Sequence, residues 1–389
     1  MRHSLLSVAL VASLLYVAVC GWTRQRAPKW ADVEEHRCRF DELQARMIST
    51  RTSLVGDVSR KRSVVTASAE WQPIRIAVFT GDVAASRQHC TKAGQRSTSF
   101  TGHTVTCEAD DVLTSTKKQI LLDLLIPSTV QLHEEHLHVQ REGGNIVVNS
   151  LVKEDPFCRQ FSIPAAHKKA GVANADFVLY MSVRPTTQDT VAWATTCQYF
   201  TNGRPAVGVA NVSPRYISDN LQMMRVVALE MLHALGFNVH NFQARSMVSS
   251  VSVRVAGSVS VPVINSPSVS VRAQHHFGCS TPAYLKLDSL GGTSTKSSPE
   301  LHLSAKDKLT AGSDGAGVYS ALTIAAMEDL GYYRGSYSMA EPIRDGNDPV
   351  GELATEKHTV NGVSLLPEVF CTFVFFFFLF TTLFLNPSD

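Results

Sequence analysis

The segment RVVALEMLHALGFNVH, residues 225–240, decides how this chain is interpreted. Its apolar residues recur at helical spacing, so we predict a helix over residues 220–235 that stops at Gly236. A helix with the pattern H-E-x-x-H carries two zinc-binding histidines on one face and a glutamate as general base. Here Glu230 and His233 fit that pattern, but Leu229 stands in place of the first histidine. Taken alone, the five residues 229–233 favour an ordinary amphipathic core helix with one polar face, because such short patterns often match by chance.

The composition sets broad limits on the class of protein. The chain has 389 residues, of which 44% are hydrophobic and 18% are charged. This length is enough for one large domain or two medium ones. The formal net charge of +2 gives no basic footprint for nucleic acid.

Both ends differ from the middle of the chain. Residues 1–20 are typical of a secretory signal peptide, with an uncleaved anchor as the alternative. We expect residues 21–62, which end in a basic triplet, to form a removable pro-segment. A linker over 351–368 precedes a hydrophobic tail at 369–385. The tail predicts a membrane span, part of a lipid-anchor signal, or a frameshifted end, and we expect the protein at the cell surface membrane.

The middle of the chain mixes strand and helix patterns. Residues 74–80, 176–183 and 205–212 are strand-like, whereas the stretch from Thr114 has helical spacing until Pro127. The alternating Val and Ser of 246–271 indicate exposed strands or loops, and 320–333 indicate a further helix. Because there is no regular alternation of strands with helices, we predict an α+β fold.

Two polar features invite functional readings. His133 and His136 could bind a metal, but their spacing is one residue short of the zinc signature, so we expect a solvated helix end or strand start there. Asn211 lies in the sequon Asn-Val-Ser, which predicts an N-glycan on a secreted chain.

Several stretches resemble the leishmanolysin family of surface metalloproteases in order and spacing. They are HRCRFDELQAR (36–46), WQPIRIAVFTGD (71–82), VAWATTCQYFTNGRPAVGVANV (191–212), VPVINSPSVSVRAQHHFGC (261–279) and YSALTIAAMEDLGYYRGSYSMAEP (319–342). The resemblance covers residues 35–350. It implies an α+β, metzincin-like zincin catalytic domain with a mixed sheet, an active-site helix and an inserted subdomain. We expect an N-terminal subdomain over 63–240 and the insertion with the C-terminal catalytic subdomain over 241–350.

The resemblance also implies roles for single residues. The general base falls on Glu230 and one zinc ligand on His233, whereas the other two ligand positions fall on Leu229 and Pro299. The methionine beneath the metal falls on Thr310. A substitute ligand would come from His302 first, or from His240, His275 or His276. Because zinc catalysis needs about three protein ligands, we expect zinc binding to be impaired.

Cysteines complete the implied pattern. By resemblance Cys90 pairs with Cys107 and Cys158 pairs with Cys197, and the pro-segment cysteine that caps zinc falls on Cys38. The family's partner for Cys279 has no counterpart here, which predicts a free or intermolecular thiol.

Three functions follow as alternatives. The first is an active zinc metalloendopeptidase that acts on proteins or peptides with a substitute ligand such as His302. The second, which we favour, is a catalytically impaired surface homologue that binds extracellular adhesion ligands. The third is the non-functional product of a decaying gene copy.

Overall fold

The computed structural model describes ten stretches of the chain. They are residues 70–99, 103–149, 156–186, 190–254, 258–277, 284–288, 302–303, 318–341, 359–360 and 363–364. The predicted signal peptide, pro-segment and hydrophobic tail lie outside these residues, so the structure does not test them.

A four-stranded mixed sheet forms the centre of the fold. Its order is β2 (Ile76–Phe79), β6 (Phe177–Ser182), β8 (Pro205–Val212) and β7 (Ala192–Tyr199). The first three strands are parallel, and β7 pairs antiparallel with β8 at one edge. The strands predicted at 74–80, 176–183 and 205–212 are confirmed. Strand β7 was not predicted, because its sequence AWATTCQY lacks both a polar–apolar alternation and the run of Val, Leu or aromatic residues found in β6 and β8.

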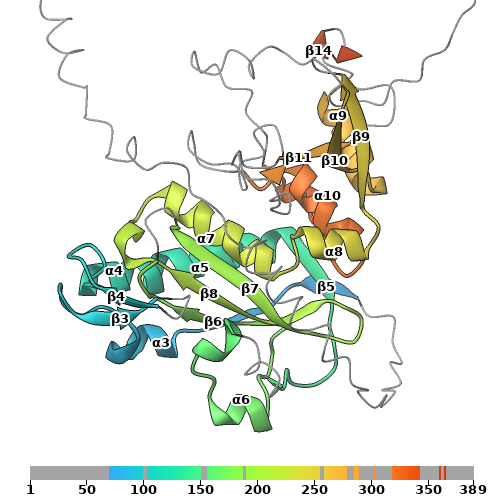
Figure 1. Cartoon of the computed structure of the whole chain (residues 1–389). Coiled ribbons are helices and arrows are strands. Elements are labelled where there is room, and N and C mark those ends of the chain that lie inside the picture. Colours follow the sequence, from blue (N-terminus) through green and yellow to red (C-terminus); the bar gives the residue numbers. More distant parts are fainter. Residues whose placement is uncertain are drawn as a thin grey trace, which may run out of the picture.

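Two helices cover one face of this sheet. They are α5 (Ile126–His136) and α7 (Leu221–Ala234), which lie side by side over the strands in Figure 1. Alternate residues of β6, such as Phe177 and Leu179, face these helices and join the larger of the two hydrophobic cores. The sheet and the two helices therefore bury each other's apolar surface.

The opposite face of the sheet packs against loops. Val178 and Tyr180 of β6 point to a second core, which also contains Phe157, Phe161 and Trp193. Both phenylalanine rings meet the Trp193 indole edge-on, with centroids 6.1 and 6.0 Å away. The short helix α6 (Ala165–Lys169) lies on this side in Figure 1.

The helix that begins after Thr114 does not stop at Pro127, so that prediction is wrong. It runs as α4 (Ser115–Gln119), a π-helical segment η3 (Ile120–Leu125) and then α5 to His136. Proline lacks a backbone N–H and normally breaks a helix interior. Here the wider π-helical turn comes directly before it and already departs from the α-helical hydrogen-bond ladder.

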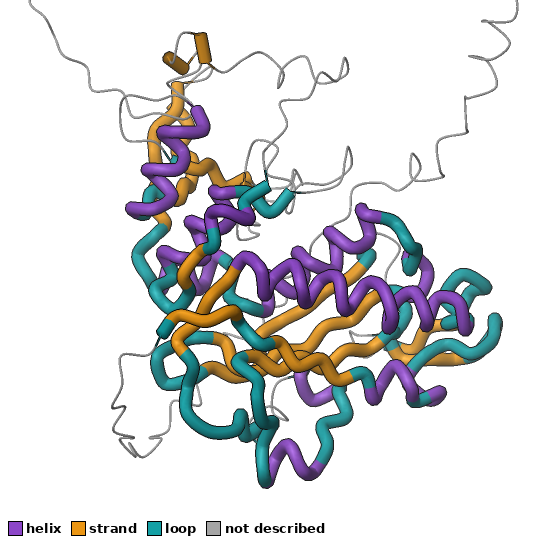
Figure 2. The backbone as a smooth tube through the Cα atoms, turned by 180° about the vertical axis from the view of Figure 1, so that it is seen from behind, coloured by secondary structure: helices purple, strands orange, loops and turns teal. Residues whose placement is uncertain are grey.

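A second group of elements follows α7. A four-stranded antiparallel sheet contains β9 (Val248–Arg254), β10 (Ser258–Ile264), β11 (Leu285–Asp288) and β12 (His302–Leu303). The strands expected in 246–271 are confirmed up to 264, but the last residues of that stretch begin helix α9 (Pro267–Phe277). Figure 2 shows this group beside the central sheet.

The helix predicted at 320–333 is confirmed as α10 (Ala321–Asp329), with Gly331 at a positive φ of 86° just after it. Buried residues of α9 and α10 belong to the same core as α7, so that core is continuous from the sheet into the second group.

The remaining described elements are short. They are β1 (Trp71–Pro73), α3 (Gly81–Ala84), η2 (Ser86–Gln88), β3 (Arg96–Thr98), β4 (Thr104–Thr106), β5 (Leu137–Gln140), η5 (Cys158–Gln160), η6 (Pro214–Tyr216), α8 (Val239–Ala244), β13 (Arg334–Gly335), η7 (Tyr337–Met339), β14 (Thr359–Val360) and β15 (Val363–Ser364). The fold mixes helices with parallel and antiparallel strands, so the α+β prediction is confirmed.

Candidate active-site helix

Helix α7 is capped by side-chain and backbone geometry at both ends. At its start the Asn220 side chain accepts a hydrogen bond from the Met223 backbone N–H at 2.8 Å. At its end Gly236 has a φ of 117°. The Gly236 N–H donates to the backbone carbonyl of His233, and the Phe237 N–H donates to the backbone carbonyl of Leu232. These two bonds form a Schellman motif, in which glycine avoids the strain of a left-handed backbone. The sequence therefore sets the length of this helix locally.

Glu230 and His233 both point into the protein. Their side chains are 2% exposed, and Glu230 Oε2 accepts a hydrogen bond of 3.1 Å from the Ala194 N–H on strand β7. The carboxylate is thus held against the edge strand by a backbone donor. This bond fixes where the predicted general base lies.

His233 has the tautomer that a metal ligand requires. Its Nδ1 lies 2.6 Å from the carbonyl oxygen of Phe237. A carbonyl only accepts, so Nδ1 carries the proton and Nε2 is the basic nitrogen of the neutral ring. An imidazole that donates its other N–H to a carbonyl is the usual arrangement of a metal-binding histidine. His233 is therefore chemically suited to its predicted role.

Leu229 occupies the predicted first-ligand position in a different way. Its side chain is 3% exposed and belongs to the larger hydrophobic core. A leucine offers no lone pair, and this one packs as an ordinary core residue. Across the residues that the structure describes, no three His, Cys, Asp or Glu side chains come together in a way that could hold a metal ion. The residues present on α7 do not fit a zinc site.

Other predicted site residues lie outside the described parts or apart from α7. Pro299, Thr310, Cys38 and Cys279 are outside the described residues. The backbone of His302 pairs with that of Asp288 between β12 and β11.

The structure describes the surroundings of two other candidate ligands, His240 and His275. His240 lies on α8, where it lines a surface hollow. His275 is exposed on α9. The structure brings none of these histidines into a described metal cluster.

The expectation that His133 and His136 are solvated is wrong. Both rings are buried, and the His136 ring stacks on Tyr319 with centroids 4.2 Å apart. Its Nδ1 lies 2.7 Å from the Leu132 carbonyl oxygen, and its Nε2 lies 2.8 Å from the Met339 carbonyl oxygen. Apolar neighbours distant in sequence bury these rings, which a local count of charged residues could not indicate.

His133 connects two helices, a contact that the sequence analysis did not predict. Its Nε2 donates to the Ala228 carbonyl of α7 at 3.0 Å, and its Nδ1 lies 3.4 Å from the Tyr319 hydroxyl. Burial lowers the pKa of His133 to about 3, so the ring is neutral. The only sequence signal was a polar residue within an otherwise apolar helical face.

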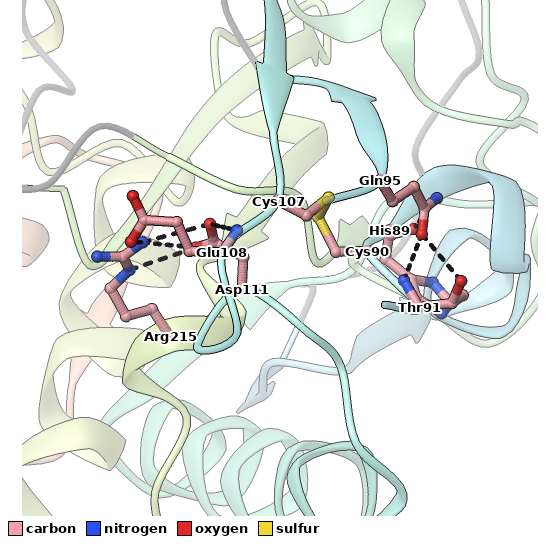
Figure 3. Close-up of a disulfide and its surroundings, with 8 residues drawn as sticks. All are labelled: His89, Cys90, Thr91, Gln95, Cys107, Glu108, Asp111 and Arg215. Atoms are coloured by element: carbon pink, nitrogen blue, oxygen red, sulfur yellow. Dashed lines mark hydrogen bonds and ion pairs between the residues drawn. A yellow bond between two sulfur atoms is a disulfide. The ribbon is translucent and has the colours of Figure 1, made fainter. Parts of the chain in front are cut away.

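The two predicted disulfides are present. Cys90 is bonded to Cys107 and Cys158 to Cys197, with Cα atoms 6.0 Å apart in both. Figure 3 shows the first bridge beside the ion pair of Arg215 with the carboxylates that follow Cys107. The second bridge lies in the smaller core, on the sheet face opposite α7.

The predicted glycan at Asn211 is wrong for the folded domain. Its side chain is 0% exposed on strand β8. Oδ1 accepts hydrogen bonds from the Ser182 hydroxyl at 2.8 Å and the Arg184 N–H at 2.7 Å, and Nδ2 donates to the Arg184 carbonyl at 3.1 Å. A sugar on Nδ2 has no room there, because the amide is fully used in joining β8 to the end of β6.

The mixed sheet has an antiparallel edge strand, and over it lies a helix with a buried Glu230 and, three positions before Gly236, a buried His233. This arrangement is consistent with a metzincin-type domain. The leishmanolysin family model matches residues 45–376. The chain is 36% identical over 390 residues to leishmanolysin of Leishmania donovani, covering 95% of this chain and 65% of that protein. It is 38% identical over 310 residues to a leishmanolysin homolog of Crithidia fasciculata, covering 79% and 47%. The chain belongs to the leishmanolysin family.

More distant relatives also match. A leishmanolysin-like peptidase of Drosophila melanogaster is 27% identical over 317 residues, which covers 59% of this chain and 46% of that protein. The chain spans between about half and two thirds of the length of the relatives first matched.

Within the described stretches, no helix is both long and apolar enough to cross a bilayer. The hydrophobic tail at 369–385 lies outside those stretches.

Proposed function

We propose that this chain is a surface-displayed leishmanolysin homologue whose catalytic helix is impaired in zinc binding, and that it acts by binding extracellular ligands. The observation that carries the proposal is the burial of Leu229 in the apolar core, at the position where the family pattern places the first zinc histidine. One remaining ligand on α7, His233, is too few for a catalytic zinc site.

The chemistry of the helix supports the same proposal. Zinc in such a site supplies Lewis acidity that makes bound water reactive near neutral pH. The residues of this chain supply only the other parts: Glu230 is held by Ala194, and His233 is oriented by Phe237. A carboxylate without the metal lacks the means to activate water to the same extent. We therefore expect no metal-dependent peptide hydrolysis.

Family membership supports the setting of this function. Relatives named leishmanolysin suggest protein or peptide ligands, and we propose that the predicted signal peptide and tail display the chain at the cell surface. The two disulfides and the mixed sheet support a folded protein.

The test is a zinc count on the purified chain, with peptide hydrolysis measured in parallel. The matched comparison is the triple variant Leu229→His, Pro299→His and Thr310→Met, which restores the family pattern. We expect the unaltered chain to hold well below one zinc and to show no chelator-sensitive hydrolysis, and the restored variant to hold about one zinc.

Stoichiometric zinc in the unaltered chain, with hydrolysis lost in Glu230→Ala, would overturn the proposal. Loss of that zinc in His302→Ala would then identify the substitute ligand. A chain that is never recovered folded from its native cell would instead favour the decaying gene copy.

A further inference from the structure

An open hollow lies beyond the glycine end of α7. Its volume is about 440 Å³, which falls within the range of about 300–1,000 Å³ usual for ligand sites. It lies between the turn that joins β7 to β8, helix α8 and the residue that follows Gly331. Its lining residues are Tyr199, Thr201, Asn202, Gly203, His240, Asn241, Ala244, Arg245 and Tyr332. Neither Glu230 nor His233 takes part in it.

Arg245 is held in place at this hollow by the fold. Its Nη2 donates to the Asn202 carbonyl at 3.1 Å, and its guanidinium carbon lies 5.1 Å from the centroid of the Tyr332 ring. A Cβ built on Gly203 would come within 3.5 Å of the same Nη2. The guanidinium group is thus positioned by a backbone carbonyl and an aromatic face, and neither contact neutralises its charge.

A second guanidinium group, that of Arg204, also lies near Tyr332. Arg204 is buried, its Nη1 donates to the Asp176 carbonyl at 3.1 Å, and its Nη2 has no hydrogen-bond partner among the described residues. Arg204 and Arg245 both act to lower the pKa of Tyr332, against a larger raising effect of burial. Their positive fields therefore meet at this phenol, on the wall of the hollow.

The rest of the lining is polar but carries no negative charge. None of the nine lining residues is acidic. Thr201 brings a hydroxyl group and the tyrosines bring ring faces. The Asn202 amide is already bonded to Glu142 and to the Arg204 N–H, and Asn241 Nδ2 donates to the Gly236 carbonyl. A guanidinium prefers a carboxylate, with which it forms paired hydrogen bonds, whereas hydroxyls and aromatic faces suit a ring that carries hydroxyl groups.

We propose that this hollow binds an acidic monosaccharide unit, with the ligand carboxylate on Arg245 and the sugar ring beside Thr201 and the tyrosine side chains. The site does not depend on the state of the catalytic helix. The chain would therefore bind this ligand whether or not zinc is bound at α7.

The experiment is a titration of the purified full chain with glucuronic acid, followed by calorimetry or ligand-observed NMR. Glucose serves as the neutral sugar of the same ring, and benzoate as a carboxylate without hydroxyl groups. We expect glucuronic acid to bind at least ten times more tightly than either. Equal binding of glucose, or benzoate as the tightest ligand, would overturn the proposal, and so would the absence of any glucuronic acid binding.

Two variants test the place of binding. Arg245→Gln removes the charge, and Ala244→Trp fills the hollow from an exposed position on α8 without removing a polar contact. We expect each to weaken glucuronic acid binding at least tenfold. Arg87→Gln, at an exposed arginine outside the hollow, is the matched control and should leave binding unchanged. Unweakened binding in Ala244→Trp would show that the sugar binds elsewhere.

Discussion

The His133 ring on α5 donates a hydrogen bond of 3.0 Å to the Ala228 carbonyl on α7, one residue before Leu229. The ring is completely buried, and the Tyr319 hydroxyl lies 3.4 Å from its other nitrogen. This histidine therefore joins three segments far apart in the sequence. Because the ring is neutral, its contribution to stability depends on pH.

The first prediction concerns that pH dependence. Burial lowers the pKa of folded His133 to about 3, whereas an unfolded histidine titrates near 6.5. Between these values the unfolded state binds one more proton, so the free energy of unfolding falls as the pH drops below 6.5. The slope approaches about 1.4 kcal/mol per pH unit.

His133→Gln keeps a donor for Ala228 and removes the titration. Urea unfolding between pH 7.5 and 4.5 should show a shallower loss of stability in this variant than in the unaltered chain. Parallel slopes for the two proteins would refute the assignment.

The second prediction concerns Leu229 as a core residue. Leu229→Ala should lower the free energy of unfolding by about 2–4 kcal/mol, because it leaves a cavity in the main core. The control is Leu221→Ala on the same helix, where the leucine is 53% exposed and the cost should stay within about 0.5 kcal/mol. Chemical denaturation of both variants measures the difference, and equal costs would show that Leu229 is not packed as described.

The third prediction concerns the ion pair between Arg225 and Glu341. Their Nη2 and Oε1 atoms are 2.5 Å apart, and Glu341 also accepts a hydrogen bond from the Tyr319 N–H. The pair ties α7 to the segment after α10. Glu341→Gln should cost about 1–2 kcal/mol, since Glu341 is partly exposed and solvent screens the pair.

A double-mutant cycle with Arg225→Met isolates the coupling between the two residues. Glu70→Gln, at an exposed glutamate, should be close to neutral. A coupling energy of zero would mean that the pair does not join these segments in solution.

The fourth prediction concerns Gly208 in the middle of strand β8. A Cβ at this position would lie 2.7 Å from Cζ of Phe177 and 3.0 Å from the Thr195 carbonyl oxygen. Gly208→Ala should therefore destabilise the fold by about 1–3 kcal/mol through overpacking. Gly81→Ala is the matched control, because a Cβ there meets nothing within 4 Å. Thermal unfolding compares the two variants. If Gly208→Ala leaves the stability unchanged, the Phe177 ring can move away from strand β8.

Local signals in the sequence were enough for much of the fold. Helix α7 has its cap residue Asn220 and its stop at Gly236 within the segment itself, and strands β6 and β8 are recognisable from their own composition. Strand β7 was missed because its sequence has neither a polar–apolar alternation nor the Val-, Leu- or aromatic-rich run that marks β6 and β8. The helix end predicted at Pro127 was wrong, because the spacing of apolar residues does not reveal the π-helical segment before it.

The same holds for the candidate site: the sequence indicated some of its features, and only tertiary contacts decided the others. The sequence alone placed Glu230 and His233 in the zinc-helix pattern and Leu229 at its first position. It also identified both disulfide pairs through the family resemblance. It did not indicate that Asn211 is consumed by hydrogen bonds, because that depends on Ser182 and Arg184 from another strand.

What the sequence determined by itself is chemical identity: Leu229 has no donor atom wherever it lies, and Gly236 can end a helix in a conformation that other residues avoid. What only the tertiary structure decided is environment. It buried His133 neutral against α7, and placed Arg245 on the wall of a hollow. The reason is that burial and electrostatic field are sums over neighbours from distant segments, and those neighbours are assigned only when the chain has folded.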